Sequence, residues 1–195
     1  MNGYSGAGDV TAPIVYVNYG LPDDFRLLDS LGVSVKGKIA IARYGRSFRG
    51  IKAREAEKAG AVGLIIYSDP AEDGFVRGDV YPKGPFRNSD APQRGSIFNG
   101  NGDPSTPGWA STADARHLPL AEMDVAHIPV VPIGYRNAQA MLEGLKGRDI
   151  PAQSWQGGLP FRYHLGGDAS TQIRVAVFPE QGEKAYKTIF NTVGI

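Results

Sequence analysis

Between residues 13 and 68, apolar runs alternate with segments of helical periodicity. Residues 14–19, 38–43 and 63–67 contain β-branched, aromatic and other apolar side chains in short runs, and we expect each to form a strand. Residues 63–67 begin with glycine and are otherwise almost entirely apolar, which is typical of a strand buried on both faces.

Two helices are expected between these strands. Asp23 and Asp24 can cap the first, which Gly32 ends. The second spans residues 50–60, with alanines at helical spacing that allow close packing. The strand, helix and strand within residues 38–67 therefore predict a βαβ unit with parallel strands.

Regular patterns return near the C-terminal end. Residues 128–133 carry two prolines, which predicts a strand at the edge of a sheet. Asn137 can cap a helix ended by Gly147, because apolar residues recur between them at i, i+3, i+4 and i+7. In residues 171–178 apolar and polar side chains alternate, which predicts a strand with one face in solvent. Residues 188–195 are mostly apolar and predict a further strand.

The stretch from residue 69 to 126 has turn residues and little periodicity. Glycine and proline, at 26 and 14 residues, supply about a fifth of the chain. Such a long irregular stretch is uncommon inside a compact domain. Its aromatic side chains argue against plain disorder, so contacts outside the domain are expected to hold it.

Composition narrows the class of protein. A chain of 195 residues fits one domain, and its net charge of +1 gives no general argument for nucleic acid or an anionic membrane. No apolar run reaches the roughly 18 residues that cross a bilayer. The absence of cysteine excludes disulfides, thiolate metal sites and a cysteine nucleophile.

The charge is nevertheless unevenly distributed, since residues 36–58 hold eight basic and two acidic side chains. Arg43, Arg46 and Arg49 lie where a predicted strand leads into a helix. Arginine there can bind a carboxylate through paired hydrogen bonds; a solvated basic face is the alternative. Nucleic acid is disfavoured, because aromatic residues do not interleave with the basic ones.

No catalytic motif is present. The three histidines, at 117, 127 and 164, lack metal-ligand spacing, and no nucleophile elbow or phosphate loop occurs. Asn99, Asn101 and Asp103 begin like a calcium loop, but proline and alanine then occupy the required glycine and glutamate positions. A calcium site made from backbone carbonyls and a simple turn cluster both remain open.

The chain resembles the protease-associated (PA) domain of glutamate carboxypeptidase II-like zinc peptidases, a superfamily that includes the transferrin receptor. The similar segments run in order over about 180 residues, and they are residues 15–19, 36–50, 59–63, 67–71, 93–95, 102–108 and 128–135. The resemblance implies an α/β (α+β) fold, rich in β-structure, with a barrel-like core, a few helices and long loops.

The resemblance also implies a substrate pocket shared with a peptidase domain. In the family, the arginine of the F-R-G motif binds the carboxylate of a C-terminal glutamate, and Arg49 holds that position. The family has asparagine after Q-R-G; Ser96 stands there, and a hydroxyl cannot supply the paired donor and acceptor of an amide. Glutamate preference is therefore in doubt, while recognition of a C-terminal carboxylate is still expected.

Calcium is implied at the interface between the two domains, through backbone carbonyls at positions matching Thr106 and Trp109. The two zinc ions and the catalytic glutamate would belong to the peptidase domain. We therefore expect residues 1–187 to form a non-catalytic PA domain, with a long irregular loop region at 70–126, and residues 188–195 to begin the peptidase domain. Its parent would lie outside the cell, in the periplasm or on a membrane anchor facing outward.

Two other functions are weighed. The first is a non-catalytic interaction module of the transferrin-receptor type, which the serine at position 96 favours. The second is an autonomous hydrolase, which the lack of a visible nucleophile–base pair disfavours. For the leading hypothesis the partners are the peptidase domain and a peptide with a free C-terminal carboxylate; nucleic acid binding and membrane insertion by this segment are not expected.

Overall fold

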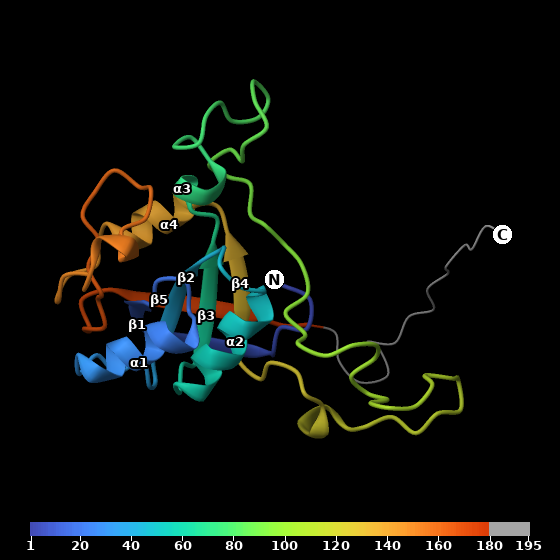
Figure 1. Ribbon diagram of the computed structural model, residues 1–195. Helices are drawn as coiled ribbons and strands as arrows, with labels where there is room; N and C mark the ends of the chain where they lie inside the picture. The colour runs from blue at the N-terminus through green and yellow to red at the C-terminus, as the bar shows by residue number, and fades with distance from the viewer. Residues whose placement is uncertain (180–195) are drawn as a thin grey trace.

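A computed structural model describes residues 1–179 of the chain. Five strands form one mixed, curled sheet in the order β4-β3-β2-β1-β5 (Figure 1). The strands are β1 (Gly8–Tyr16), β2 (Ile39–Arg43), β3 (Gly63–Tyr67), β4 (Val130–Ile133) and β5 (Gln172–Val177). The helices are α1 (Pro22–Ser30), α2 (Arg49–Lys58), α3 (Pro70–Asp73) and α4 (Tyr135–Leu142), with short 3-10 turns η1 (Leu120–Glu122) and η2 (Gln153–Trp155).

Strands β1 to β4 run parallel to one another, and β5 pairs antiparallel with β1. Every residue of β2 and β3 is buried, which fits central strands covered on both faces. In α2 the buried positions include Ala53 and Ala56, whose small side chains let the helix lie close to the sheet. The predicted β-rich α/β class and the parallel βαβ unit are confirmed.

Two elements differ from expectation. β1 begins at Gly8, because residues 8–13 pair with all of β5, a strand more than 150 positions away. α4 begins at Tyr135 after Gly134, so Asn137 lies inside the helix and does not cap it. The strand expected at 188–195 lies outside the described residues.

Two long excursions leave the sheet (Figure 1). Residues 74–90 extend beyond α3, and residues 100–126 form an arm that extends away from the α/β body. The arm contains only the 3-10 turn η1 as regular structure. No helix within residues 1–179 combines the length and the apolar character that crossing a bilayer requires.

Strand β4 is an edge strand, as its prolines predict, and the N-terminal strap, residues 2–6, lies along it. Two backbone hydrogen bonds hold the strap there. Asn2 N donates to Val130 O in β4 over 3.3 Å, and Gly6 N donates to Ile128 O, just before β4, over 3.1 Å. On its other side, Gly3 N donates to Gly95 O at 3.1 Å and Gly3 O accepts from Ile97 N at 3.0 Å. The strap therefore joins the segment around Ser96 to the sheet.

Candidate functional site

Arg49 and Ser96 are neighbours in the folded chain. Arg49 begins α2, shortly after β2 ends, while Ser96 belongs to the segment that the N-terminal strap holds. The Arg49 Nη1 donates a hydrogen bond to the backbone carbonyl of Ser96 over 3.1 Å. The fold thus brings together two of the residues that the sequence suggested for one site.

The Arg49 guanidinium has no acidic partner within residues 1–179. Its Nε is buried and lacks a hydrogen-bond partner there. Gly95 permits this position of the guanidinium, because a Cβ on that residue would lie 2.6 Å from Nη1. The side chain is therefore partly buried, hydrogen-bonded to the Ser96 carbonyl and not neutralised by an ion pair within residues 1–179.

Tyr44 lies beside this arginine and fixes the segment before Ser96. Its hydroxyl donates to the Gln93 carbonyl over 2.5 Å. Burial raises the pKa of Tyr44, and the nearby positive charge of Arg49 opposes that rise. The phenol therefore remains a neutral hydrogen-bond donor at physiological pH.

The hydroxyl of Ser96 is turned toward its own segment. Its Oγ accepts a hydrogen bond from the backbone N–H of Phe98 over 3.1 Å. Toward Arg49, Ser96 therefore contributes its main-chain carbonyl and not its side chain. An amide at this position would offer both a donor and an acceptor in place of a hydroxyl.

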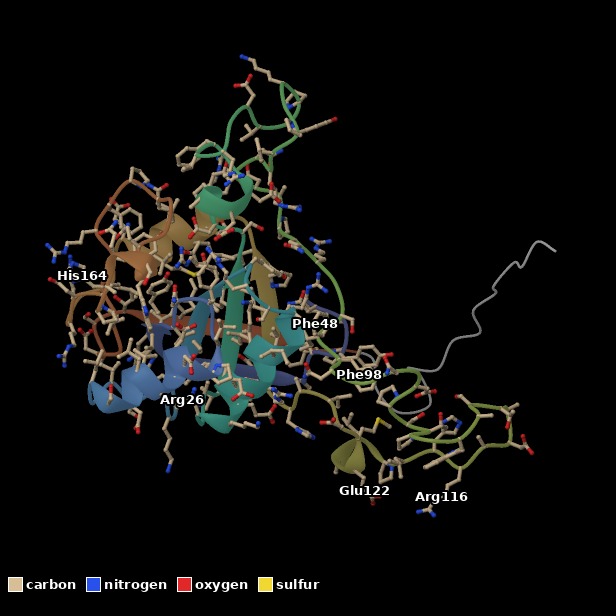
Figure 2. All side chains as sticks on the ribbon, viewed as in Figure 1. Arg26, Phe48, Phe98, Arg116, Glu122 and His164 are labelled. Atoms are coloured by element: carbon tan, nitrogen blue, oxygen red, sulfur yellow. The ribbon has the colours of Figure 1, made fainter. Side chains whose placement is uncertain are left out.

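Aromatic side chains come from three segments near this pair: Phe48 directly precedes Arg49, Tyr4 lies on the strap, and Phe98 follows Ser96 by two residues. The Arg49 Cζ lies 5.5 Å from the centre of the Phe48 ring, and the Tyr4 and Phe98 rings are 5.2 Å apart. Tyr4 and Phe48 are 46% and 45% exposed. Figure 2 shows Phe48 and Phe98 where the α/β body meets the arm. Arg49 therefore lies against one half-exposed ring, that of Phe48.

Two basic residues of this segment, Arg43 and Lys52, do not belong to a solvated basic face. Arg43 is 2% exposed, donates to Asp69 Oδ2 over 3.4 Å and lies 4.0 Å from the centre of the Tyr19 ring. Lys52 is fully buried, and burial lowers its pKa to about 8. Both are interior residues, so only part of the counted charge faces solvent.

Arg46 faces solvent at a backbone φ of +64°, in the left-handed region. Its guanidinium lies 5.6 Å from the centre of the Tyr19 ring, whose hydroxyl donates to Glu72. Hydrogen bonding to Tyr19 raises the pKa of Arg46. Arg46 is therefore engaged with Tyr19, whereas Arg49 contacts Ser96 and Phe48.

Thr106 and Trp109 lie together on the arm. The Thr106 carbonyl accepts from Trp109 N over 3.3 Å, and the Trp109 indole donates to Arg116 O over 2.9 Å. Asp103 braces this turn by accepting from Ser105 and from a second serine further along the arm. No hydrogen bond or ion pair within the described chain connects Thr106 or Trp109 to Arg49.

Metal ligands do not gather within residues 1–179, where no group of three or more histidine, aspartate or glutamate side chains could hold an ion. The histidines lie in separate places. His117 is 2.7 Å from Ser105 Oγ, His127 pairs with Glu57 at 3.1 Å, and His164 pairs with an aspartate at 3.1 Å.

Sequence reasoning missed Tyr44 as a neighbour of Arg49, and it missed the packing of Tyr4 against Phe98 next to the Ser96 segment. Tyr4 and Phe98 come from irregular segments whose positions depend on pairing between the strap and residues 95–97. Tyr44 follows β2 within the basic segment, residues 36–58, where only the charged side chains indicated a site. Only the aromatic residue directly before Arg49 carried a local signal, as part of the F-R-G motif.

Known proteins are similar over most of the chain. A curated relative, "Glutamate carboxypeptidase 2 homolog" of Caenorhabditis briggsae, is 42% identical over 173 residues, 84% of this chain and 22% of that protein. "Probable glutamate carboxypeptidase" of Arthroderma benhamiae is 39% identical over 206 aligned residues, 100% of this chain and 28% of that protein. The chain thus spans about a quarter of these relatives.

Among solved structures, "Aminopeptidase from Aneurinibacillus sp. strain AM-1" aligns with a TM-score of 0.40 at 25% identity, over 70% of this chain and 22% of that one. The profile of the PA domain matches residues 10–141, which is more than half of the chain. This chain therefore belongs to the PA domain family.

Proposed function

We propose that this chain is the PA domain of a glutamate carboxypeptidase-like metallopeptidase, in which it supplies part of the substrate pocket. The observation that carries the proposal is the Arg49 guanidinium, which is anchored at the Ser96 carbonyl and has no acidic partner in residues 1–179. A cation held in this way can receive a carboxylate through its remaining N–H groups. The names of the curated relatives support a peptidase as the parent.

In this proposal the chain binds and orients, and the chemistry belongs to a peptidase domain of the same parent protein. That domain would carry the two zinc ions. Arg49 would bind the terminal carboxylate of a peptide, and thereby fix the distance from the peptide end to the bond that is cut.

A calcium ion between the two domains is part of the same proposal. The Thr106 and Trp109 carbonyls would be this chain's ligands, with carboxylates from the peptidase domain completing the site. Because two carbonyls alone bind calcium weakly, we expect the melting temperature of the 195-residue chain to stay within about 1 °C when millimolar calcium is added. A clear stabilisation by calcium would instead indicate a site complete in this chain.

The clamp is tested in the full-length parent by Arg49→Ala. Removing one partner of a charge-assisted pair costs about 2–4 kcal/mol, which is on the order of 100-fold in KM for a peptide with a free C-terminal carboxylate. Arg54→Ala is the matched control, since Arg54 is exposed on the same helix and should leave KM unchanged.

Unchanged kinetics in Arg49→Ala would reject the clamp. A parent without peptidase activity would favour the interaction module of the transferrin-receptor type, which has no substrate to hold. The observation that favours this second candidate is the hydrogen bond that the Ser96 hydroxyl accepts from Phe98 N, because it directs the hydroxyl toward its own segment.

A further inference from the structure

We propose that Asn101 is a site of spontaneous covalent modification, at which its side-chain amide is converted to a carboxylate through a cyclic imide formed with Gly102. The inference concerns the arm, residues 100–126, and is independent of the carboxylate clamp at Arg49. The reaction is a deamidation, whose co-reactant is water. Its product places a new negative charge on the arm.

The reaction needs an asparagine followed by a residue whose backbone nitrogen is accessible. The Gly102 nitrogen loses its proton and bonds to the Asn101 Cγ, while the side-chain nitrogen takes up a proton and leaves as ammonia. Water then opens the five-membered imide at either carbonyl, which yields aspartate or its β-linked isomer. Glycine in the second position favours ring closure, because it has no Cβ to shield the nitrogen or to restrict the backbone.

The described residues contain three asparagine–glycine pairs, which begin at Asn2, Asn99 and Asn101. The dipeptide alone does not rank them, so their surroundings in the fold decide which one reacts. Hydrogen bonds and close packing slow the reaction, because they must open before the side chain can reach the backbone nitrogen.

Asn2 is protected by burial and by its place beside the sheet. The residue is 0% exposed. The nitrogen that would attack it, Gly3 N, donates to Gly95 O over 3.1 Å. Ring closure at this pair would therefore require the N-terminal strap, residues 2–6, to leave the segment that it holds.

Asn99 is exposed, but contacts on both sides restrain it. Its Nδ2 donates to Gly50 O over 3.0 Å, which ties the side-chain amide to the first turn of α2. The Phe98 ring covers the following residue, since a Cβ on Gly100 would lie 2.5 Å from it. The amide and the attacking nitrogen are therefore both restrained in the folded chain.

Asn101 has no such restraint. It is exposed, and its side chain makes no hydrogen bond within residues 1–179. In the same range the Gly102 N–H has no acceptor, and a Cβ on Gly102 would meet no atom within 4 Å. The arm that carries this pair extends away from the α/β body (Figure 2). Both reacting groups are therefore open to each other and to solvent.

The modification changes the charge of a hollow on the arm. Asn101 lines this hollow, of about 280 Å³, together with Asp103, Glu122 and Asp124. The product adds a fourth acidic side chain to the lining, and the β-linked isomer also adds a methylene to the backbone. Modified and unmodified chains should therefore differ in their attraction for cations at this hollow.

The test is incubation of the 195-residue chain near neutral pH, folded and, in parallel, unfolded in concentrated urea. Peptide mapping by mass spectrometry measures deamidation at each pair, and separate elution identifies the β-linked isomer. In the folded chain we expect Asn101 to react about tenfold faster than Asn99, which must first break a hydrogen bond of ordinary strength. Asn2 should react more slowly still. In urea the three rates should converge, because the protecting contacts are gone.

Variants assign the reaction to this pair. Asn101→Gln should remove most of the change, because glutamine closes its six-membered ring slowly. Gly102→Ala should slow the reaction several-fold, since the methyl group shields the nitrogen; there is open space for it, although the φ of +73° disfavours alanine. Asn137→Gln is the matched control, because Asn137 is exposed on α4 and precedes alanine, and it should leave the deamidation rate unchanged.

Three results would overturn the proposal. Equal rates at Asn99 and Asn101 in the folded chain would mean that the contact with Gly50 gives no protection. No reaction at Asn101 while the urea sample converts would show that the folded arm holds this pair closed. The same order of rates in urea as in the folded chain would assign the selectivity to neighbouring residues in the sequence and not to the fold.

Discussion

The ammonium of Lys52 lies inside the domain, where it holds two loops together. Its Nζ donates to Tyr19 O over 2.6 Å and to Gly45 O over 2.7 Å, at the carboxyl ends of β1 and β2. Desolvation lowers its pKa to about 8, against an attraction to Asp24 that raises it. The residue is structural, yet it makes the stability of the domain depend on pH.

The free energy of unfolding should rise as the pH is raised from about 8 to about 10. In this range the unfolded chain keeps the Lys52 proton, because its pKa there is near 10.4, while the folded chain loses it. The unfolded state then binds more protons, so stability increases, by up to about 3 kcal/mol. Urea unfolding at half-unit pH steps measures this slope.

Lys52→Gln supplies the control for this slope. Its amide can donate to the same carbonyls without titrating, so the rise between pH 8 and 10 should disappear. Above pH 10 the sign reverses in both proteins, because burial holds the pKa values of Tyr16 and Tyr67 well above their usual value. A rise of equal size in Lys52→Gln would show that another group titrates.

At the scale of elements, the first turn of α2 is the point where the candidate site is assembled. A Cβ on Gly50 would lie 2.3 Å from the Ile97 carbonyl and 2.6 Å from Asn99 Oδ1. The glycine therefore permits the segment after Ser96 to touch the helix that begins with Arg49. The distance between the two predicted site residues depends on this close approach.

Gly50→Ala should destabilise the domain by about 1–3 kcal/mol, because the inserted methyl must displace backbone that the strap also holds. It should also shift the amide resonances of Ser96 and Phe98. Gly144→Ala is the control, since its added Cβ would meet its nearest atom at an ordinary 3.6 Å. Equal urea midpoints for the two variants would show that the segment moves aside freely.

Local patterns predicted the elements whose partners are close in sequence. β2, α2 and β3 follow one another within residues 38–67, so the two apolar runs and the alanine spacing between them were informative. The first half of β1 was missed because Gly8 to Pro13 has weak strand propensity and is held by its antiparallel partner β5.

The candidate site was predictable only in part. Arg49 and Ser96 stand in recognisable motifs, and their contact follows from the fold. Arg43 looked like a member of an exposed basic cluster, and nothing local to it indicated that Asp69 and the carbonyls of residues 154 and 156 would bury it. A count of charged residues cannot predict which of them are buried, because burial depends on segments that are distant in the sequence.

At the scale of the whole molecule, one buried polar network joins the sheet to the chain after α4. Asp69, fully buried, accepts from Arg43 and from the Tyr67 hydroxyl at one oxygen. At the other it accepts from the backbone N–H groups of Ala71 and Gly158. This carboxylate therefore connects β2, β3, the start of α3 and the segment after η2.

Asp69→Ala should cost about 3–5 kcal/mol of stability, because it leaves the buried Arg43 charge without its carboxylate. Asp149→Ala is the matched control, since Asp149 pairs with an exposed Arg162 and its loss should cost less than about 1 kcal/mol. Native-state hydrogen exchange locates the effect: the Gly158 amide should lose protection together with β2 and β3, because one acid serves all three. If Gly158 alone lost protection while β2 and β3 kept theirs, the segment after η2 would be an independent flap, and the sheet would be stable without this network.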